Sequence, residues 1–317
     1  MISWKLLILK IYKMKTYLVT GAAGFVGAAL SKSLIEKGNK VVTIDNLSTG
    51  FEDSIPDGVV FYKGNVQDEI VIEKLEKYNF ECIFHIAGQS SGEISYDDPV
   101  YDLQTNAQST LLLLKLAQKT DCKKFIYAST MSVYGDNKEF VCEEDATEPK
   151  SFYGVGKLAS EKYLKIFSND IITTSLRLFN IYGPGQNMKN MRQGMVSIFL
   201  QQALTSNEIE VKGSLKRFRD FVYIDDVISA FLSAENRKST EKKIYNIGTG
   251  IKHTVSQLIE TISCNFEEDK IISQNSNTPG DQFGIYSNSN LAIKELNWKP
   301  KVSLNEGIKI MVEYYRK

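Results

Sequence analysis

The residues best suited to chemistry are a tyrosine and a lysine, Tyr153 and Lys157, in the run YGVGK. On a helix this spacing places both side chains on one face. A phenol that acts as a base must lose its proton near neutral pH, and a neighbouring ammonium stabilises the phenolate. The upstream run ASTMSVYG adds the hydroxyls of Ser129, Thr130 and Ser132, which can polarise a substrate oxygen. A tyrosine–lysine pair is common by chance, so the surrounding elements must support this interpretation.

Three glycines, Gly21, Gly24 and Gly27, stand between an apolar run and a helix-like segment in TYLVTGAAGFVGAAL. Glycine there permits a tight turn and a close approach of the backbone to a pyrophosphate at the helix N-terminus. Asp45 ends the next apolar run, where a carboxylate can accept both hydroxyls of an adenosine ribose and repels a 2′-phosphate. No arginine occurs in the following NLSTG, so the sequence predicts NAD rather than NADP.

Two later segments are also expected beside the cofactor. Asn65, in KGNVQD, follows the third expected strand and can contact the adenine edge. The segment HIAG, residues 85–88, follows the fourth, and its small residues are expected to line the cofactor. His85 itself is interpreted as a packing residue at a strand end.

Strands alternate with helices over the first part of the chain, which predicts a doubly wound parallel sheet of the Rossmann type, an α/β fold. The expected strands are 16–20, 40–45, 59–62, 82–86, 123–128 and 171–178, and the long helices are 100–119 and 152–167. Residues 1–13 are interpreted as an N-terminal extension, 14–180 as the NAD-binding domain, and 181–317 as a smaller α/β substrate-binding part. The runs VYIDDVISAF and KIYNIG are expected to return to the main sheet, and NIYGPGQNMKNMRQG to form a functional loop.

The composition argues against several classes of binding partner. Lys+Arg and Asp+Glu both number 38, and this neutral balance gives no support for a nucleic-acid or anionic-membrane partner. The four cysteines form no CxxC pair and the two histidines are far apart, so no metal site is expected. No apolar stretch reaches the roughly 18 residues of a membrane span. Reduced thiols in the cytoplasm are expected.

Taken together, these motifs resemble the extended short-chain dehydrogenases, and within them the UDP-hexose 4-epimerases. The likeness rests on GxxGxxG, on DNLSTG and HIAG, on Asn106, on Thr130 with Tyr153 and Lys157, and on RLFNIYGPGQ. It implies that NAD is contacted by Gly21, Gly24, Phe25, Val26, Gly27, Asp45, Asn46, Ser48, Thr49, Gly50, Asn65, Val66, Ala87, Gly88, Gln89, Asn106, Tyr153 and Lys157.

The resemblance also implies a reaction. Tyr153 takes the proton of the sugar 4-hydroxyl while hydride passes to NAD, the 4-keto sugar rotates, and hydride returns to the opposite face. Lys157 is expected to lower the pKa of Tyr153, and Thr130 to hold the 4-oxygen. The implied UDP-sugar contacts are Ser132, Asn180, Val211 through its backbone, Arg219, Asp281 and Ile285.

Two positions depart from the pattern of the resembling epimerases. Asn65 stands where those enzymes usually have an aspartate, and Thr278 stands where they place a second arginine on the diphosphate. Arg192 and Gln282 are candidates to replace that arginine. Ile285 falls at the position that sets room for an N-acetyl group, and an isoleucine there favours UDP-N-acetylhexosamines alongside UDP-glucose and UDP-galactose.

Other reactions on the same scaffold are less well supported. A 4,6-dehydratase needs an Asp-Glu pair after the strand-end threonine, and a decarboxylase needs a glutamate at Ser132; here the residues are Met131 and Ser132. A sensor that only binds NAD would be expected to have lost the catalytic residues. The resemblance also implies a homodimer formed through the two long helices, although their apolar stripes (Leu111, Leu114, Leu158 and Tyr163) could equally be internal core.

Overall fold

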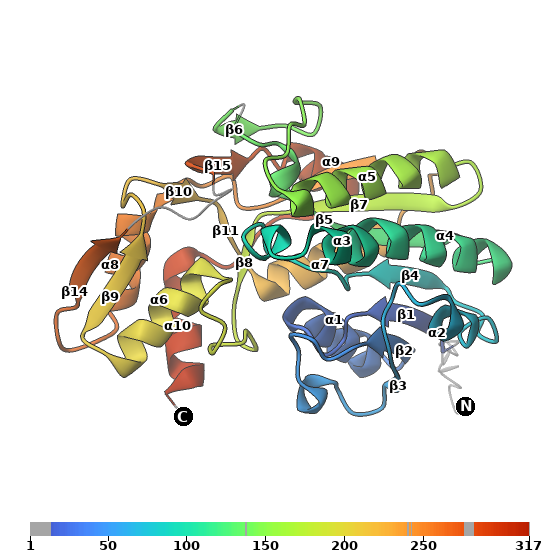
Figure 1. Ribbon diagram of the computed structural model, residues 1–317, viewed down its shortest axis with the longest axis horizontal. Helices are drawn as coiled ribbons and strands as arrows, with labels where there is room; N and C mark the ends of the chain where they lie inside the picture. Colours follow the sequence, from blue (N-terminus) through green and yellow to red (C-terminus); the bar gives the residue numbers. More distant parts are fainter. Residues whose placement is uncertain (1–13, 137, 240, 242, 276–281, 317) are drawn as a thin grey trace, which may run out of the picture.

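The computed structural model describes residues 14–136, 138–239, 241, 243–275 and 282–316. The expected extension 1–13, and the positions Thr278 and Asp281, lie outside the described residues. Within them, seven parallel strands form a central sheet in the order β12-β7-β5-β4-β1-β2-β3 (Figure 1). The strands are β1 Thr16–Thr20, β2 Lys40–Asp45, β3 Val60–Lys63, β4 Cys82–His85, β5 Lys124–Thr130, β7 Ile172–Leu178 and β12 Lys243–Ile247.

Helices cover both faces of this sheet, which is why β1, β2, β4, β5 and β7 are buried almost throughout. One face packs against α1 (Phe25–Glu36) and α7 (Ile224–Glu235) in one large core. The other packs against α2 (Glu69–Glu73), α4 (Ser109–Lys119) and α5 (Phe152–Phe167) in a second core. The direction of winding reverses between β1 and β4, and ligands of such sheets bind at that reversal. The predicted fold class is confirmed.

The predicted helix 100–119 is interrupted. It begins as α3 (Pro99–Leu103), widens to one π turn (Gln104–Gln108), and continues as α4. A π turn frees a backbone carbonyl from the helical pattern, and such turns often occur at functional sites. Here the carbonyl of Asn106 accepts hydrogen bonds from Thr110 Oγ1 at 2.8 Å and, across to α5, from Ser160 Oγ at 2.9 Å. The widened turn therefore fixes α3 and α4 against α5.

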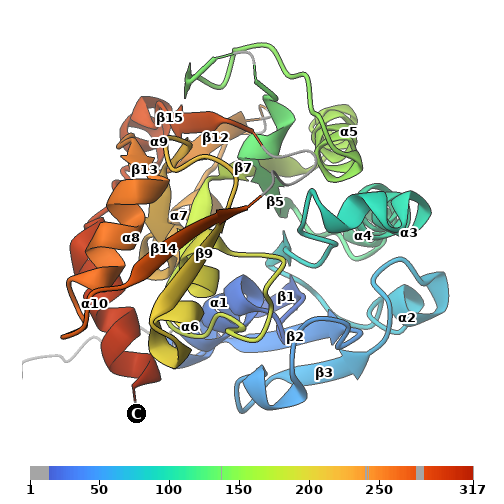
Figure 2. The same cartoon turned by 60° about the vertical axis from the view of Figure 1, so that its left-hand side comes forward.

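The C-terminal part of the chain adds one strand to the sheet and builds the wall beside it. β12 pairs with β7, whereas the other strands form small sheets around α6, α8 and α10 (Figures 1 and 2). The strands of the small sheets are β8 Asn180–Tyr182, β9 Glu208–Lys212, β10 Phe218–Arg219, β11 Phe221–Tyr223, β13 His253–Thr254, β14 Ile271–Asn275 and β15 Gly284–Ser287, joined by β6 Phe140–Val141 from the N-terminal part, which pairs with β15. The helices are α6 Met195–Thr205, α8 Val255–Ser263, α9 Asn290–Leu296 and α10 Leu304–Tyr315.

None of the helices described between residues 14 and 316 is both long enough and apolar enough to cross a bilayer.

A buried ion pair fixes α5 to the sheet. Arg177, on β7, donates to Glu161 through Nε at 2.9 Å and through Nη2 at 2.8 Å, and both side chains are almost fully buried. The Ser129 hydroxyl donates to the same carboxylate at 2.6 Å. Ser129 was expected to polarise a substrate oxygen, but its hydroxyl is instead bonded to Glu161.

Removing Glu161 leaves the Arg177 guanidinium buried without its carboxylate. Breaking such a pair from one side costs about 3–5 kcal/mol. We therefore expect Glu161→Ala to lower the free energy of unfolding by that amount in a urea titration. Glu76→Ala is the control, because its partner Lys119 is largely exposed and the pair is screened by water. Equal urea midpoints for the two variants would contradict this account of α5.

Candidate active site

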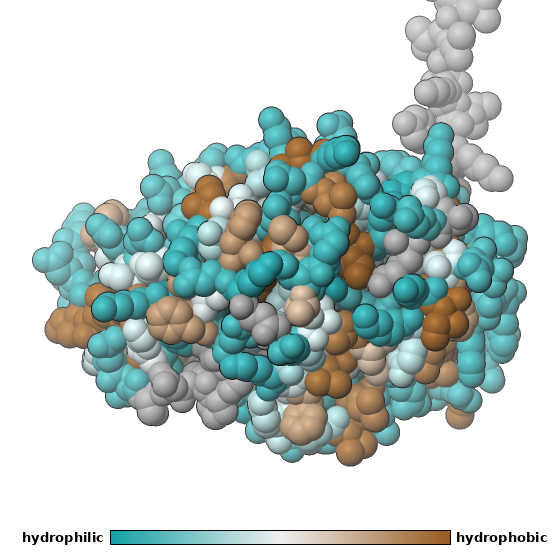
Figure 3. Space-filling model, turned by 90° about the horizontal axis from the view of Figure 1, so that it is seen from above, coloured by the Kyte–Doolittle hydropathy of each residue, from teal (hydrophilic) through white to brown (hydrophobic). Residues whose placement is uncertain are grey.

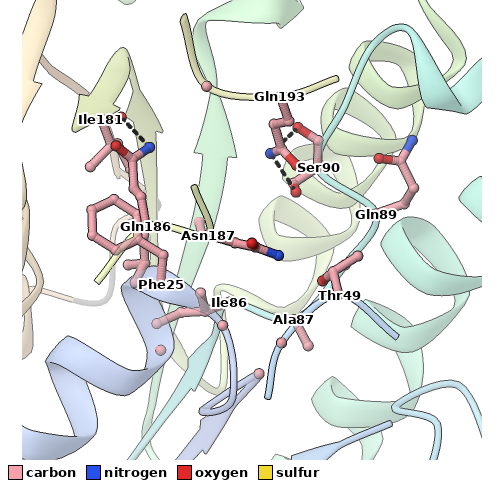
Figure 4. A pocket seen from close by; sticks show the side chains of 18 of the residues that line it. Phe25, Thr49, Ile86, Ala87, Gln89, Ser90, Ile181, Gln186, Asn187 and Gln193 are labelled. Atoms are coloured by element: carbon pink, nitrogen blue, oxygen red, sulfur yellow. Dashed lines mark hydrogen bonds between the residues drawn. The ribbon is translucent and has the colours of Figure 1, made fainter. Parts of the chain in front are cut away.

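A cavity of about 710 Å³ opens along the carboxyl edge of the central sheet. Segments that follow β1, β2, β4, β5 and β7 line one side of it, and the chain between β8 and α6 lines the other (Figure 4). Ligands of parallel α/β sheets bind at this edge. The cavity thus extends from the glycine-rich segment after β1 to the hydroxyl-bearing segment after β5.

The glycine turn forms the floor of the cavity. Gly21 has φ +79°, in the left-handed region that favours glycine, and its carbonyl accepts a hydrogen bond from Gly24 N at 3.1 Å. A Cβ on Gly27 would lie 2.0 Å from the Gly21 carbonyl oxygen, so only glycine allows α1 to start so close to β1. Gly24 caps α1 with no side-chain hydrogen bond, and it lines the cavity together with Phe25 and Val26. The N-terminus of α1 therefore faces the cavity, as anion binding requires.

Asp45 lies at the end of β2 on the cavity wall, as predicted. Its Oδ2 accepts a hydrogen bond from Ala23 N at 3.0 Å, and its Oδ1 accepts one from Leu47 N at 2.8 Å. These bonds aim the carboxylate at the glycine turn, where an adenosine ribose would lie. Four further predicted contacts, Asn46, Ser48, Thr49 and Gly50, also line the cavity.

The adenine end differs from the prediction. Asn65 is exposed, accepts a hydrogen bond from Asn46 Nδ2 at 2.8 Å, and is not among the residues that line the cavity. Val66 lines it as expected, and so does Gln67, which sequence reasoning missed. Within the described part of the chain, Gln67 Oε1 is buried with no hydrogen-bond partner. A buried acceptor on the wall suits the amino edge of a base, so the site fits a dinucleotide.

The segment after β4 lies close to the predicted catalytic lysine. Ala87, Gly88 and Gln89 line the cavity, whereas Asn106 lies directly behind Gly88. A Cβ on Gly88 would be 2.3 Å from Asn106 Oδ1 and 3.5 Å from Lys157 Nζ. Asn106 Nδ2 donates to the carbonyl of Gln89 at 3.0 Å. Glycine at position 88 therefore lets this amide and the lysine approach the cofactor side of the cavity.

The three predicted catalytic residues meet on one wall of the cavity. Thr130 ends β5, and its Oγ1 donates to Ser132 Oγ at 3.2 Å. Tyr153 stands in the first turn of α5, which Ser151 caps by accepting from Gly154 N at 3.1 Å. Lys157 Nζ donates to the carbonyl of Ala128 at 2.9 Å and lies 5.8 Å from the centre of the Tyr153 ring.

Burial dominates the protonation of this pair. Burial raises the pKa of Tyr153 to about 12, and the negative charge of Asp102 raises it further. The hydrogen bond with the Thr130 hydroxyl acts in the opposite direction and lowers the Tyr153 pKa. Burial also lowers the pKa of Lys157 to about 8, against which the negative charge of Asp102 acts. The ammonium is therefore still protonated at pH 7 and loses its proton as the pH rises through about 8. The lowering of the Tyr153 pKa by Lys157 stays a prediction for the loaded site.

The substrate residues that the resemblance implies separate into two groups. Ser132 and Asn180 line the cavity, and Asn180 Nδ2 contacts Met131 Sδ at 3.4 Å. Three others do not line it in the part of the chain that the structure describes. Val211 is fully buried in β9, and Ile285 is fully buried in a cluster behind Met131. Asp281 is not described.

Arg219, the third of these, is held against backbone. It is 3% exposed, and its guanidinium donates to the carbonyls of Phe218 at 2.7 Å, Gln282 at 2.8 Å and Phe283 at 3.3 Å. Arg192, a candidate replacement for the second diphosphate arginine, donates instead to Asp97 at 2.8 Å and Glu93 at 3.3 Å. Gln282 Nε2, the other candidate, donates to the carbonyl of Gly135.

The loop predicted to be functional lines the cavity. Gln193 Nε2 donates to Ser90 Oγ at 2.8 Å and to Ser90 O at 3.1 Å, and so joins this loop to the segment after β4 (Figure 4). At its other end the Tyr315 hydroxyl accepts from Gly185 N at 3.0 Å and donates to Gln186 O at 2.8 Å. The loop is thus anchored to both halves of the chain.

The contact between Gly27 and the Gly21 carbonyl predicts the effect of a single methyl group. Gly27→Ala must open the turn, and we expect the amount of NAD retained after purification to fall at least tenfold while the protein stays folded. Gly38→Asn is the control, because this left-handed position (φ +78°) has open space and asparagine tolerates that conformation. Equal NAD content in the two variants, measured after acid release, would contradict the role of this turn.

Comparison with known proteins agrees with this geometry. The sequence model described as the NAD dependent epimerase/dehydratase family matches residues 17–248. The UDP-glucose 4-epimerase of Mycolicibacterium smegmatis is 32% identical, over 94% of this chain and 98% of that protein. The structure of the Thermotoga maritima UDP-glucose 4-epimerase with UDP-glucose is 36% identical with a TM-score of 0.90, covering 95% of this chain and 98% of that one. The Thermus thermophilus UDP-glucose 4-epimerase complexed with NAD is 30% identical with a TM-score of 0.88, covering 95% and 99%. The chain therefore belongs to the NAD dependent epimerase/dehydratase family, and its cofactor is NAD.

Proposed function

We propose that the protein is a UDP-hexose 4-epimerase, which inverts the hydroxyl at C4 of the sugar and recycles its own NAD. Three observations support this: the meeting of Thr130, Tyr153 and Lys157 on the cavity wall, the dinucleotide end of the same cavity, and the similarity to epimerases over nearly the whole chain. Related reactions use the same scaffold, so the choice among them depends on the acids present at the substrate end.

The distribution of carboxylates carries the proposal. Of the described residues that line the cavity, only Asp45 has a carboxylate, and it lies at the ribose end beside the glycine turn. At the substrate end, Thr130 is followed by Met131 and Ser132, neither of which can act as a general acid. Elimination of water at C5 and C6 needs such an acid. An oxidised sugar in this site is therefore expected to be reduced again at C4.

The residues of the chain divide the chemistry among them. NAD, when bound, supplies reversible hydride uptake at a carbon that carries a hydroxyl. Tyr153 Oη accepts the proton of the sugar 4-hydroxyl and later returns it. This role requires a Tyr153 pKa nearer to neutral than the value of about 12 that burial gives it in the chain without NAD. The Lys157 ammonium favours the phenolate while it is protonated, that is, below about pH 8. The hydroxyl of Thr130 holds the 4-oxygen.

The proposed substrates are UDP-hexoses in general, with or without an N-acetyl group. The argument for N-acetylhexosamines depended on Ile285 as a wall residue, but Ile285 is fully buried behind the wall and Met131 lines the cavity. The position therefore favours neither N-acetylated nor plain hexoses. We still propose that Asn180 and Arg219 contact the diphosphate. The backbone at Val211 remains the proposed contact of the uracil.

The direct test incubates the purified protein with UDP-glucose, UDP-galactose and both UDP-N-acetylhexosamines, without added NAD, and separates the products. We expect interconversion of the C4 epimers of at least one pair. Tyr153→Phe should lower kcat by about 10²–10⁴-fold, because the ring stays but its titrating hydroxyl is lost. Tyr163→Phe is the matched control, since Tyr163 lies on the same helix and packs in the second core.

Two results would count against the proposal. One is a 4-keto-6-deoxy product, or carbon dioxide released from UDP-glucuronic acid, which would indicate a dehydratase or a decarboxylase. The other is a wild-type protein that retains NAD but never reduces it when a UDP-sugar is added, which would indicate a sensor.

We also propose that the protein is a homodimer. The stripes singled out in the sequence are mostly internal, because Leu114 is fully buried and Leu158 and Tyr163 pack in the cores. A different set of large apolar side chains is exposed on α3 and α5. It consists of Val100, Leu103, Phe152, Val155 and Ile166. In Figure 3, which looks onto the side that carries α5, hydrophobic side chains stand among hydrophilic ones. Large apolar side chains exposed on two neighbouring helices suit a partner surface.

The double variant Leu103→Asp/Val155→Asp places charge in this apolar set and should dissociate a dimer that uses it. We expect light scattering after size exclusion to give twice the chain mass of 35.8 kDa for the wild type and the single mass for the variant. Ile271→Asp, at an equally exposed apolar position on β14, should leave the mass unchanged. A wild type of single mass would contradict the proposal.

A further inference from the structure

We propose that Asp102 is a positioning residue of this site: its carboxylate fixes the amides of Gln89 and Asn106 and holds Lys157 in its cationic form. Asp102 does not line the cavity, and no motif in the sequence singled it out. Its expected effect on catalysis rests on the proposed function, whereas its effect on Lys157 does not.

Asp102 lies in the layer directly behind the catalytic wall. It stands on α3, just before the π turn, and is 0% exposed. The helix α5 approaches it at Gly156, where a Cβ would lie 3.3 Å from Asp102 Oδ1 and 3.3 Å from Asn106 Cβ. Gly156 immediately precedes Lys157. The carboxylate is therefore packed against the one turn of α5 that carries the lysine.

The hydrogen bonds of Asp102 determine which way two amides face. Its Oδ2 accepts from Gln89 Nε2 at 2.9 Å and from Asn106 Nδ2 at 3.2 Å. An ionised carboxylate only accepts hydrogen bonds, so it must face the NH₂ group of each amide. Asn106 Oδ1 is thereby turned the other way, toward Gly88 and the neighbouring Lys157 Nζ. Without the negative charge, the amide of Asn106 could flip and present a donor to the ammonium.

The charge of Asp102 also bears on Lys157 directly. An ammonium as deeply buried as that of Lys157 is costly unless a negative charge lies near it. Burial lowers the pKa of Lys157, and the charge of Asp102 is what acts in the opposite direction. Burial likewise raises the pKa of Asp102, while its bonds to Asn106 and Gln89 and the charge of Lys157 lower it.

The other titratable groups that face Lys157 cannot supply this charge. His85, on β4, is kept neutral because burial and Lys157 lower its pKa. Tyr127 on β5 and Tyr153 on α5 both have raised pKa values, chiefly through burial. Glu161, one turn further along α5, is already bonded to Arg177. Asp102 is thus the carboxylate that balances the lysine.

A structural role for Asp102 in α3 does not account for these contacts. An acidic residue in a first helical turn can favour the helix dipole. The N-terminus of α3 is already capped by Asp98, whose Oδ1 accepts from Tyr101 N at 2.9 Å. The carboxylate of Asp102 instead faces the interior. Within the described chain its Oδ1 has no hydrogen-bond partner at all, which is costly for a merely structural group.

The test compares Asp102→Asn, which keeps the shape and removes the charge, with the wild-type holoenzyme. Trace acetylation of Lys157 by acetic anhydride, followed by mass spectrometry across the pH range, reports the fraction of the lysine that is unprotonated. We expect the midpoint of labelling to fall by about one pH unit or more in the variant. Asp170→Asn, exposed in the turn that follows α5, is the control and should leave the midpoint unchanged.

Turnover of the UDP-sugar gives the second readout. The alkaline limb of the kcat–pH profile should move to lower pH by the same amount as the labelling midpoint, with KM within about twofold of wild type. An unshifted midpoint, or a kcat that is lower equally at every pH, would overturn the proposal. Asp102→Ser is the second variant and must shift the midpoint in the same direction. If neither variant folds, Asp102 serves stability and the proposal is wrong.

These readouts keep the two proposals apart. A wild-type protein that converts no UDP-hexose, while Asp102→Asn still shifts the Lys157 midpoint, would overturn the proposed function and support the role of Asp102. Conversion of UDP-hexoses with no shift of that midpoint would do the opposite.

Discussion

The burial of one ammonium group, that of Lys157, is the constraint on which the rest of the structure depends. A lysine kept away from water tends to lose its proton, and a neutral amine could not favour a phenolate on Tyr153. The surrounding structure compensates in three ways. The carbonyl of Ala128 at the end of β5 accepts a hydrogen bond, the ring of Tyr127 faces the charge at 4.8 Å, and Asp102 lies behind. Each group comes from the assembled sheet or from a helix packed on it, so their arrangement requires the complete fold.

Local signals in the sequence were sufficient for the elements that bind the cofactor. The bounds of β1, β2 and α5 are those predicted, because apolar runs and helical spacing mark them directly. The glycine turn was equally predictable, since its close contacts admit no side chain. The π turn at Gln104–Gln108 was not, because the polar run QTNAQ carries no local signal that separates a π turn from an α-helical one. Asp102 was missed because its bond to Gln89 and its approach to α5 form only in the folded chain.

The differences from the sequence-based expectations at the two ends of the site have a common physical origin. Counting along the chain fixes the position of a residue, but the direction of its side chain depends on the local structure of its segment. Ile285 lies in β15, a strand that the sequence analysis did not predict, and its side chain enters the core, whereas the neighbouring Tyr286 contacts Phe140 on the other face. At the adenine end the predicted contact fell on exposed Asn65, and Gln67 lines the cavity instead. Which side chain of each segment faces the cavity is decided by tertiary packing.

The hydroxyl of Tyr315 links the cavity to a helix outside the main sheet. The catalytic wall is built on β5 and α5. The loop on the other side of the cavity is held at Gly185 and Gln186 by this hydroxyl of α10, which accepts from the first backbone and donates to the second. Without the hydroxyl the catalytic wall would be unchanged, but this end of the loop would lose its anchor to α10. The two sides of the cavity are therefore held in place by different parts of the chain.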